Sequence, residues 1–218
     1  MIFQLTDDLI FPPPELAGNE GLLAVGGDLN IDRLILAYSQ GIFPWYGPGD
    51  PILWWSPDPR LILVPDEFHV SRRLARIIRQ GIFQLTLNKS FPEVIRACAS
   101  IPRRGQEGTW IVEEMIEAYC RLYEAGYCYS VECWQGRRLV GGLYGICLGK
   151  VFFGESMFSL VSNSSKVALA HLVNCLKEWD FDMIDCQMKT NHLISLGARE
   201  ISGREFRKRL SLSVEPPY

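Results

Sequence analysis

The stretch that decides the fold is residues 127–158, YCYSVECWQGRRLVGGLYGICLGKVFFGESMF. It holds three runs rich in β-branched and aromatic residues, separated by turn residues, which is the pattern of an antiparallel meander. A helix is predicted next over residues 166–179, and the strand FDMIDCQ over 181–187. Consecutive strands, one helix laid across them and a returning strand predict a domain of the α+β class.

The first sixty residues have a different character from the rest of the chain. They contain three of the six tryptophans and many of the prolines, and their turn-rich segments surround one predicted helix, residues 31–39. We therefore expect a small N-terminal α/β domain over residues 1–60 and the main domain over 61–218. The other predicted helices span residues 71–80, 90–99, 112–125 and 205–210. Ser71 is the expected cap of the first of these, and Ser90 with Glu93 forms an expected capping box at the start of the second.

The composition is that of an ordinary globular protein. The 218 residues are 48% hydrophobic and 22% charged, and the net charge is −3, so any contact with RNA requires a local basic patch. The seven cysteines lack C-x-x-C spacing and the three histidines are scattered, which predicts neither a metal site nor a cofactor site. The start of the chain carries Asp7 and Asp8 where an export signal would be apolar, and no apolar run reaches the length of a membrane span. We expect a cytoplasmic protein.

The segment IDCQ (184–187) is the first candidate for a catalytic site. Alternate side chains of a strand point to opposite faces, so Asp185 and Gln187 are expected to share one face, and Cys186 the core face. An aspartate and a glutamine side by side can orient an amine and accept its proton. The alternative is a strand end whose polar groups face water.

The segment FFGESMF (152–158) is the second candidate. A carboxylate among large apolar groups is costly unless it meets a cation or hydrogen-bond donors. Glu155 is therefore either paired within the fold or available to a cationic ligand. The neighbouring apolar side chains either line a binding pocket or pack in the core. These side chains are Phe152, Phe153, Met157 and Phe158.

The predicted helix 71–80 is strongly basic. Arg72, Arg76 and Arg79 recur at the spacing of one helix face, and Arg73 adds a fourth guanidinium without any carboxylate nearby. Such a face is either ordinary solvated surface or a contact for phosphates, which the guanidinium fork matches.

Several motifs, in order along nearly the whole chain, closely resemble those of the leucyl/phenylalanyl-tRNA–protein transferase family. They are GLLAVGGDL (21–29), AYSQGIFPWY (37–46), ILWWSPDPR (52–60), EGTWI (107–111), LVGGLYG (139–145), GESMFS (154–159), IDCQ (184–187) and HLISLGA (192–198).

The resemblance implies a C-terminal domain with a fold like that of the GNAT acetyltransferases and a specific reaction. Leucine or phenylalanine, and by weak apolar discrimination methionine, would pass from leucyl-tRNA or phenylalanyl-tRNA to the α-amino group of proteins beginning with Arg or Lys. This would mark those proteins for degradation. Asp185 and Gln187 would take part in the proton step, while Glu155, Trp45 and Trp110 would bind the reacting groups. We further expect a pocket for the donor side chain, shaped by Phe152, Phe153, Met157 and Phe158, and contacts to tRNA phosphates from Arg72, Arg73, Arg76 and Arg79.

Two other functions keep part of this pattern. An acetyl-CoA-dependent acetyltransferase would share the fold but needs a glycine-rich turn at a helix start, and SNSSK (162–166) is a poor version of one. A non-catalytic RNA-binding module would need a broader basic surface. It would also leave the polar pair Asp185 and Gln187 of the IDCQ segment unexplained.

Overall fold

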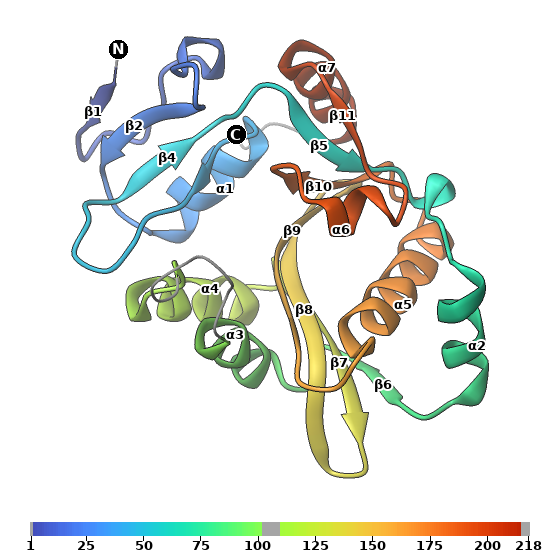
Figure 1. The fold of residues 1–218 in the computed structure, drawn as a ribbon. Helices are drawn as coiled ribbons and strands as arrows, with labels where there is room; N and C mark the ends of the chain where they lie inside the picture. The colour runs from blue at the N-terminus through green and yellow to red at the C-terminus, as the bar shows by residue number, and fades with distance from the viewer. Residues whose placement is uncertain (1, 102–109, 215–218) are drawn as a thin grey trace.

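A computed structural model describes residues 2–101 and 110–214 of the chain. In this part of the chain, seven strands form the main sheet, which runs through the middle of the molecule (Figure 1). In spatial order they are β11 (Arg199–Ile201), β5 (Arg60–Leu63), β10 (Met183–Gln187), β9 (Val151–Ser159), β8 (Arg138–Leu148), β7 (Cys128–Gln135) and β6 (Gln84–Leu87).

The predicted meander is confirmed, because β7, β8 and β9 pair antiparallel in chain order. Strand β10 then returns parallel to β9, after the connecting helix α5 (Ser164–Glu178), and pairs antiparallel with β5 on its other side. The main sheet is therefore mostly antiparallel, and among its described strands β9 and β10 form the one parallel pair. That pair carries both segments singled out from the sequence.

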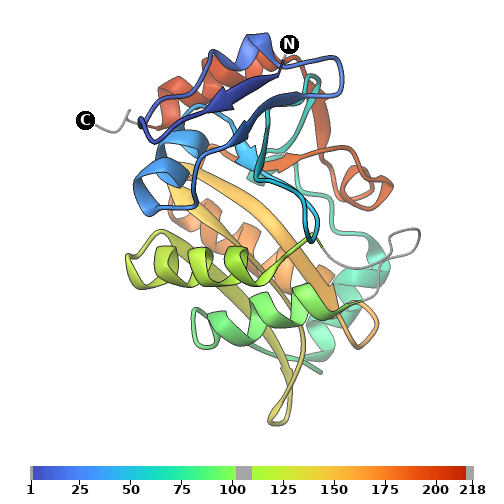
Figure 2. The same cartoon turned by 90° about the vertical axis from the view of Figure 1, so that its left-hand side faces the viewer.

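Helices cover both faces of the main sheet. Helix α5 packs on β7 and β8, and α2 (Arg72–Gln80) lies beside it. On the opposite face lie α3 (Phe91–Ser100) and α4 (Glu113–Glu124), which Figure 2 shows crossing in front of the strands. None of the helices formed by the described residues is long and apolar enough to cross a membrane.

The N-terminal part of the chain forms a second, smaller sheet. Its strands, in spatial order, are β1 (Phe3–Leu5), β2 (Leu22–Gly26), β4 (Leu53–Trp55) and β3 (Phe43–Pro44). Helix α1 (Ile31–Ser39), which has the predicted bounds, packs against α4 and β8. The α+β class, with a small N-terminal unit beside a larger sheet, is confirmed.

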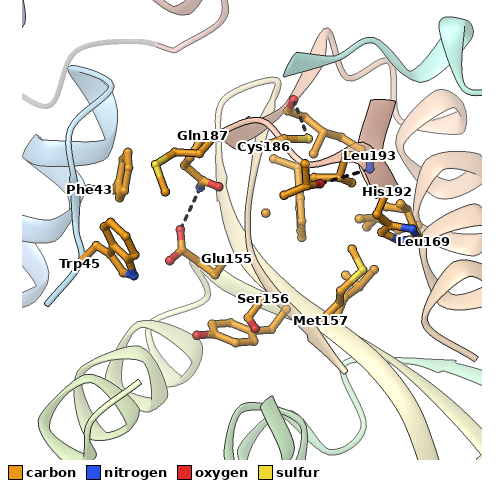
Figure 3. A pocket seen from close by; sticks show the side chains of 18 of the residues that line it. Phe43, Trp45, Glu155, Ser156, Met157, Leu169, Cys186, Gln187, His192 and Leu193 are labelled. Atoms are coloured by element: carbon orange, nitrogen blue, oxygen red, sulfur yellow. Dashed lines mark hydrogen bonds between the residues drawn. The ribbon is translucent and has the colours of Figure 1, made fainter. Parts of the chain in front are cut away.

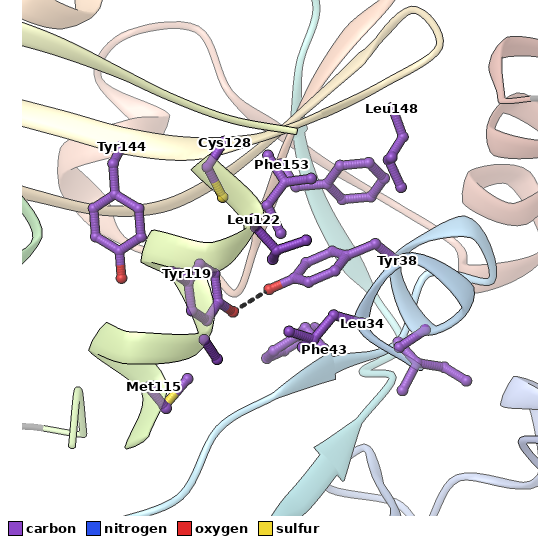
Figure 4. Close-up of a cluster of buried hydrophobic side chains, with 14 of the residues drawn as sticks. Leu34, Tyr38, Phe43, Met115, Tyr119, Leu122, Cys128, Tyr144, Leu148 and Phe153 are labelled. Atoms are coloured by element: carbon purple, nitrogen blue, oxygen red, sulfur yellow. Dashed lines mark hydrogen bonds between the residues drawn. The ribbon is translucent and has the colours of Figure 1, made fainter. Parts of the chain in front are cut away.

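One hydrophobic cluster joins the two sheets. Leu34, Tyr38 and Phe43 from the N-terminal unit pack with Met115 and Tyr119 of α4 (Figure 4). The N-terminal unit is therefore fixed against the main sheet by a shared core.

Two predicted helix caps have different outcomes. The Ser71 hydroxyl accepts the amide of Leu74 at 3.2 Å, so the predicted cap of α2 is confirmed. The predicted capping box of α3 is wrong, since the side chain of Ser90 makes no capping hydrogen bond among the described residues. The buried Glu132 of β7 accepts the Ser90 amide instead.

The remaining elements are short or terminal. They are the 3₁₀ turns η1 (Pro14–Leu16) and η2 (Pro65–Glu67), and the helices α6 (Asn191–Ile194) and α7 (Gly203–Ser213). The first three residues of the motif EGTWI lie outside the described residues.

Candidate active site

A cavity of about 430 Å³ opens between β9, β10, α6 and the segment around β3 (Figure 3). Its volume lies within the range of small-molecule sites, roughly 300–1,000 Å³. Most of the wall is apolar, and Glu155 and Gln187 lie together at one end, which we call the polar end of the cavity (Figure 3). The apolar and aromatic lining includes Phe43, Trp45, Trp110, Leu143, Phe152, Met157, Leu169, Leu172, Ile184, Met188 and Leu193; the polar lining includes Glu155, Ser156, Cys186, Gln187, Thr190 and His192.

The divergence of two strands opens this cavity. The ladder between β9 and β10 runs to the pair Asp185–Phe153, and both Glu155 and Gln187 lie beyond it. Each strand is also irregular at that point. The register between β8 and β9 shifts beside Glu155, and Gln187 has a φ of 55°. The two polar side chains are therefore turned toward one another instead of following strict alternation.

Gly145 makes the shift in β9 possible. A Cβ on Gly145 would lie 2.2 Å from the carbonyl oxygen of Phe153 and 2.6 Å from the ring of Phe152. Only glycine allows the strands to approach this closely.

Glu155 lies at the polar end of the cavity, where three side chains donate to its carboxylate. The Tyr38 hydroxyl donates to Oε1 at 2.7 Å and the Tyr119 hydroxyl to Oε2 at 3.1 Å. The amide Nε2 of Gln187 is 3.4 Å from Oε1. The two phenol oxygens are themselves 2.5 Å apart. Of the two sequence alternatives for Glu155, the structure shows pairing within the fold, yet the side chain remains partly exposed toward the cavity.

The pKa of Glu155 is raised to about 7. Burial is the main cause and outweighs the hydrogen bonds from Tyr38 and Tyr119, which favour the carboxylate. Near neutral pH this group therefore exists in both protonation states, which is the property required of a general base.

Asp185 faces away from the cavity. It is completely buried, and the guanidinium of Arg60 holds both of its oxygens, with Nε donating to Oδ1 at 2.8 Å and Nη2 to Oδ2 at 2.6 Å. Oδ1 also accepts the backbone amide of Gln187 at 3.0 Å. The expectation that Asp185 and Gln187 share one face is wrong, because the φ of 55° at Gln187 breaks the alternation and only Gln187 lines the cavity. Asp185 can therefore act on a ligand only through Gln187.

The expected core face of the IDCQ segment is confirmed in part. Ile184 is buried in a hydrophobic cluster and Cys186 packs against that cluster. Both residues also line the cavity, together with Met188, because the strand pair has opened beside them. Burial raises the pKa of the Cys186 thiol well above its usual range, so a thiolate nucleophile is disfavoured there.

The four apolar residues expected around Glu155 divide between two environments. Phe152 and Met157 line the cavity, as expected. Phe153 and Phe158 belong instead to the hydrophobic cluster on the other face of the sheet, so the pocket role expected for them is wrong. Phe153 packs edge-on against Tyr38, at 5.2 Å between ring centroids. The shift in β9 places both Phe152 and Met157 on the cavity side.

Trp45 and Trp110 lie at the cavity wall, as the motifs led us to expect. Trp45 is held by Trp55, whose indole N–H donates to the Trp45 carbonyl at 2.6 Å and whose ring lies 5.4 Å away. A fixed indole at a cavity mouth offers a face on which a base can stack.

The arginine face is separate from the cavity. Arg72, Arg73, Arg76 and Arg79 are all exposed on α2, and in the described part of the chain none of them forms an ion pair or lines the cavity. The structure is therefore compatible with both alternatives for this face, ordinary solvated surface and a contact for phosphates.

Sequence reasoning missed several residues of the site. Tyr38 and Tyr119 come from helices remote in sequence. Only their helical spacing, four residues after the buried Leu34 in α1 and the buried Met115 in α4, places them on inward faces. His192 also lines the cavity, and burial, followed by the charge of Lys166, lowers its pKa. Among the described residues, no three His, Cys, Asp or Glu side chains are grouped to hold a metal ion.

Comparison with known proteins identifies the family of this chain. Residues 62–211 match the family described as leucyl/phenylalanyl-tRNA protein transferase, and residues 27–58 match the N-terminal domain of the same family. A protein of Nitrosospira multiformis named leucyl/phenylalanyl-tRNA–protein transferase is 59% identical over 212 residues, which are 96% of this chain and 91% of that protein. One of Desulforapulum autotrophicum with the same name is 53% identical over 214 residues, 98% and 93% of the two chains.

Solved structures give only remote likenesses. An aminoglycoside acetyltransferase from a soil metagenome, in complex with trehalose, has a TM-score of 0.38 and 13% identity, over 63% of this chain and 93% of that one. The L-PGS of Bacillus licheniformis has a TM-score of 0.39 and 11% identity, over 86% and 64%.

The sequence matches place this protein among the aminoacyltransferases. The chain belongs to the leucyl/phenylalanyl-tRNA protein transferase family.

Proposed function

We propose that this protein transfers leucine or phenylalanine, and also methionine, from aminoacyl-tRNA to the α-amino group of proteins that begin with Arg or Lys. The observation that carries the proposal is the partly exposed carboxylate of Glu155 beside the Gln187 amide, at the polar end of an apolar cavity. The cavity suits the donor side chain, and the polar pair suits the acceptor amine.

The donor is bound through apolar contact. Phe152, Met157 and Leu169 form walls without a charged side chain and accept a flexible or planar hydrocarbon group. Such a pocket discriminates by only about 1–3 kcal/mol per methylene, so overlapping use of Leu, Phe and Met follows. Trp45 and Trp110 stack against the terminal base of the donor tRNA.

The chemistry needs only the ester of the donor and a free amine. The amine nitrogen attacks the ester carbonyl, the bond to the ribose oxygen breaks, and the amine proton passes through Glu155 to that oxygen. An α-amino group has a pKa of about 7.7–8.0, close to that of Glu155, so little free energy is needed for the transfer. Gln187 orients the amine, and Asp185 contributes through Gln187, since Arg60 occupies both of its oxygens.

The charge near the site supports a cationic acceptor. Glu155 is anionic when ready to accept a proton. A second cavity, of about 640 Å³, is lined by Tyr46, the chain neighbour of Trp45, by the acidic side chains of Asp50, Glu114 and Glu117, and by the cationic Arg121, so acidic groups are in excess among its described lining residues. An acceptor that begins with Arg or Lys matches this sign of charge.

The donor tRNA contacts the arginine face of α2 through phosphates. All four guanidiniums there are exposed without an ion-pair partner in the described part of the chain, and the overall charge of −3 requires such a local patch. We further propose that the reaction occurs in the cytoplasm and marks the acceptor for degradation. The two units are residues 1–60 and 61–218, a division supported by the separate family matches to 27–58 and 62–211.

Steady-state transfer with phenylalanyl-tRNA and an Arg-initiated peptide tests the proposal. Gln187→Ala is expected to lower kcat by about 10–100-fold, the range typical of lost orientation. Gln84→Ala, at an exposed position on β6, serves as the matched control and keeps the wild-type kcat. Absence of transfer by the wild type, with acetyl-CoA consumed instead, would replace this function with acetyl transfer. Equal activity of the two variants would remove Gln187 from the reaction.

A further inference from the structure

Arg60 is a completely buried arginine that does not line the cavity. It opens β5, directly before Leu61, which is the partner of Gln187 in the sheet register. Its guanidinium grips Asp185 side-on through two hydrogen bonds, at 2.8 and 2.6 Å. Two parallel bonds fix both the position and the plane of a carboxylate, which one point charge cannot do.

The guanidinium of Arg60 is itself held between two aromatic rings. Its central carbon lies 4.9 Å from the ring centre of Phe43 and 4.6 Å from that of Phe206. Phe43 belongs to β3 and lines the cavity, whereas Phe206 belongs to α7. The small N-terminal sheet, the main sheet and the last helix therefore meet at this one side chain.

Asp185 connects Arg60 to the cavity through the backbone of Gln187. Its Oδ1 accepts the backbone amide of Gln187 at 3.0 Å, and Gln187 has a φ of 55°, a conformation that non-glycine residues rarely adopt. This backbone conformation directs the side-chain amide of Gln187 to within 3.4 Å of Glu155 Oε1. The contacts are thus continuous from the two rings, through Arg60 and Asp185, to the polar end of the cavity.

We propose that Arg60 is a positioning residue for aminoacyl transfer: by fixing both oxygens of Asp185 it holds the backbone of Gln187 so that its amide faces Glu155. This inference rests on the proposed function for the role of the Gln187–Glu155 pair. If Arg60 only compensated the charge of Asp185, any cation would serve. If it positions Asp185, the two parallel N–H donors of the guanidinium are required. Arg60→Lys keeps the charge and removes the paired donors, so it separates charge compensation from positioning.

The chain offers a matched control in Arg33. It is the second arginine among the described residues with almost no exposure, at 1%, and it pairs with Asp28 at 3.2 Å and with two carbonyls of the N-terminal segment. Like Arg60, it has one buried Nη1 without a hydrogen-bond partner in the described structure. Arg33→Lys therefore perturbs a similarly buried guanidinium that does not touch the site, although its partner Asp28 is 40% exposed.

The test compares the wild type, Arg60→Lys and Arg33→Lys by amide hydrogen exchange and by transfer kinetics. In Arg60→Lys we expect the Gln187 amide to exchange about tenfold faster and kcat to fall about tenfold or more, with KM for aminoacyl-tRNA within about twofold of the wild type. In Arg33→Lys the Gln187 amide and kcat remain at wild-type values. An unchanged Gln187 amide in folded Arg60→Lys overturns the proposal, and so does an equal loss of kcat in the control.

A milder variant covers the case in which Arg60→Lys does not fold. Phe206→Leu removes one aromatic face and leaves the ion pair, so both effects are expected in the same direction at about two- to fivefold. Unchanged exchange and kcat in this variant overturn the proposal. The exchange measurement does not depend on activity. A wild-type protein that transfers nothing contradicts the proposed function, while the Gln187 amide still decides the role of Arg60.

Discussion

Replacing Glu155 with glutamine removes the titrating group at the polar end of the cavity and keeps its size. The pKa of Glu155 is raised from 4.5 to about 7, mainly by burial. The folded protein therefore binds this proton more tightly than the unfolded chain does. The resulting stability is present at low pH and is lost as the pH rises from 4.5 to about 7. At about 1.4 kcal/mol per pH unit, the whole displacement corresponds to about 3 kcal/mol.

Urea unfolding at several pH values measures this effect. Between about pH 5 and about pH 8, the free energy of unfolding of the wild type relative to Glu155→Gln is expected to fall by about 2.5 kcal/mol, since most of the titration lies in that window. All other titrating groups are common to the two proteins and cancel in the difference. Glu124→Gln, at an exposed position on α4, controls for the loss of one negative charge. A difference that stays constant within about 0.5 kcal/mol over this range would refute the assignment of a raised pKa to Glu155.

Three further changes test other parts of the account. Arg72→Gln combined with Arg76→Gln is expected to lower the slope of log binding constant against log salt by roughly two for aminoacyl-tRNA, and an unchanged slope would make α2 ordinary surface. Met157→Ala widens the cavity and is expected to shift the ratio of kcat/KM for phenylalanine over leucine upward by about tenfold in competition assays, whereas an unchanged ratio would place the donor side chain elsewhere. Gly145→Ala brings a methyl group to within 2.2 Å of the Phe153 carbonyl and is expected to cost roughly 2 kcal/mol or more in urea unfolding; wild-type stability would mean that the strands there are not so closely packed.

The sequence predicted the local parts of the fold well. The helix 31–39 and the meander were predictable because turn residues delimit both and because the pairing partners are neighbours in sequence. The parallel placement of β10 beside β9 was not predictable, since it depends on the crossover connection through α5. The N-terminal strands were also missed, because runs of two to five residues carry too little periodicity.

The site was predictable only in part, for a related reason. Glu155 and Gln187 stand out in sequence as polar groups in apolar strands, and the structure brings them together. Which of the four apolar side chains beside Glu155 line the cavity was not predictable, because the register shift in β9 that places both Phe152 and Met157 there has no unmistakable sequence signal. Arg60 lies 125 residues from Asp185 in the chain, and nothing in a single sequence identifies that pair.

The product of the reaction tests the central claim most directly. Purified protein is incubated with leucyl-tRNA or phenylalanyl-tRNA and two peptides that differ only in beginning with Arg or with Glu, and mass spectrometry records the peptide masses. The account predicts that the Arg-initiated peptide alone gains one leucine or phenylalanine residue, without ATP, and that Glu155→Gln slows this gain. Addition to both peptides alike would contradict the acceptor selectivity proposed for the site, and addition to neither would contradict the proposed transfer itself.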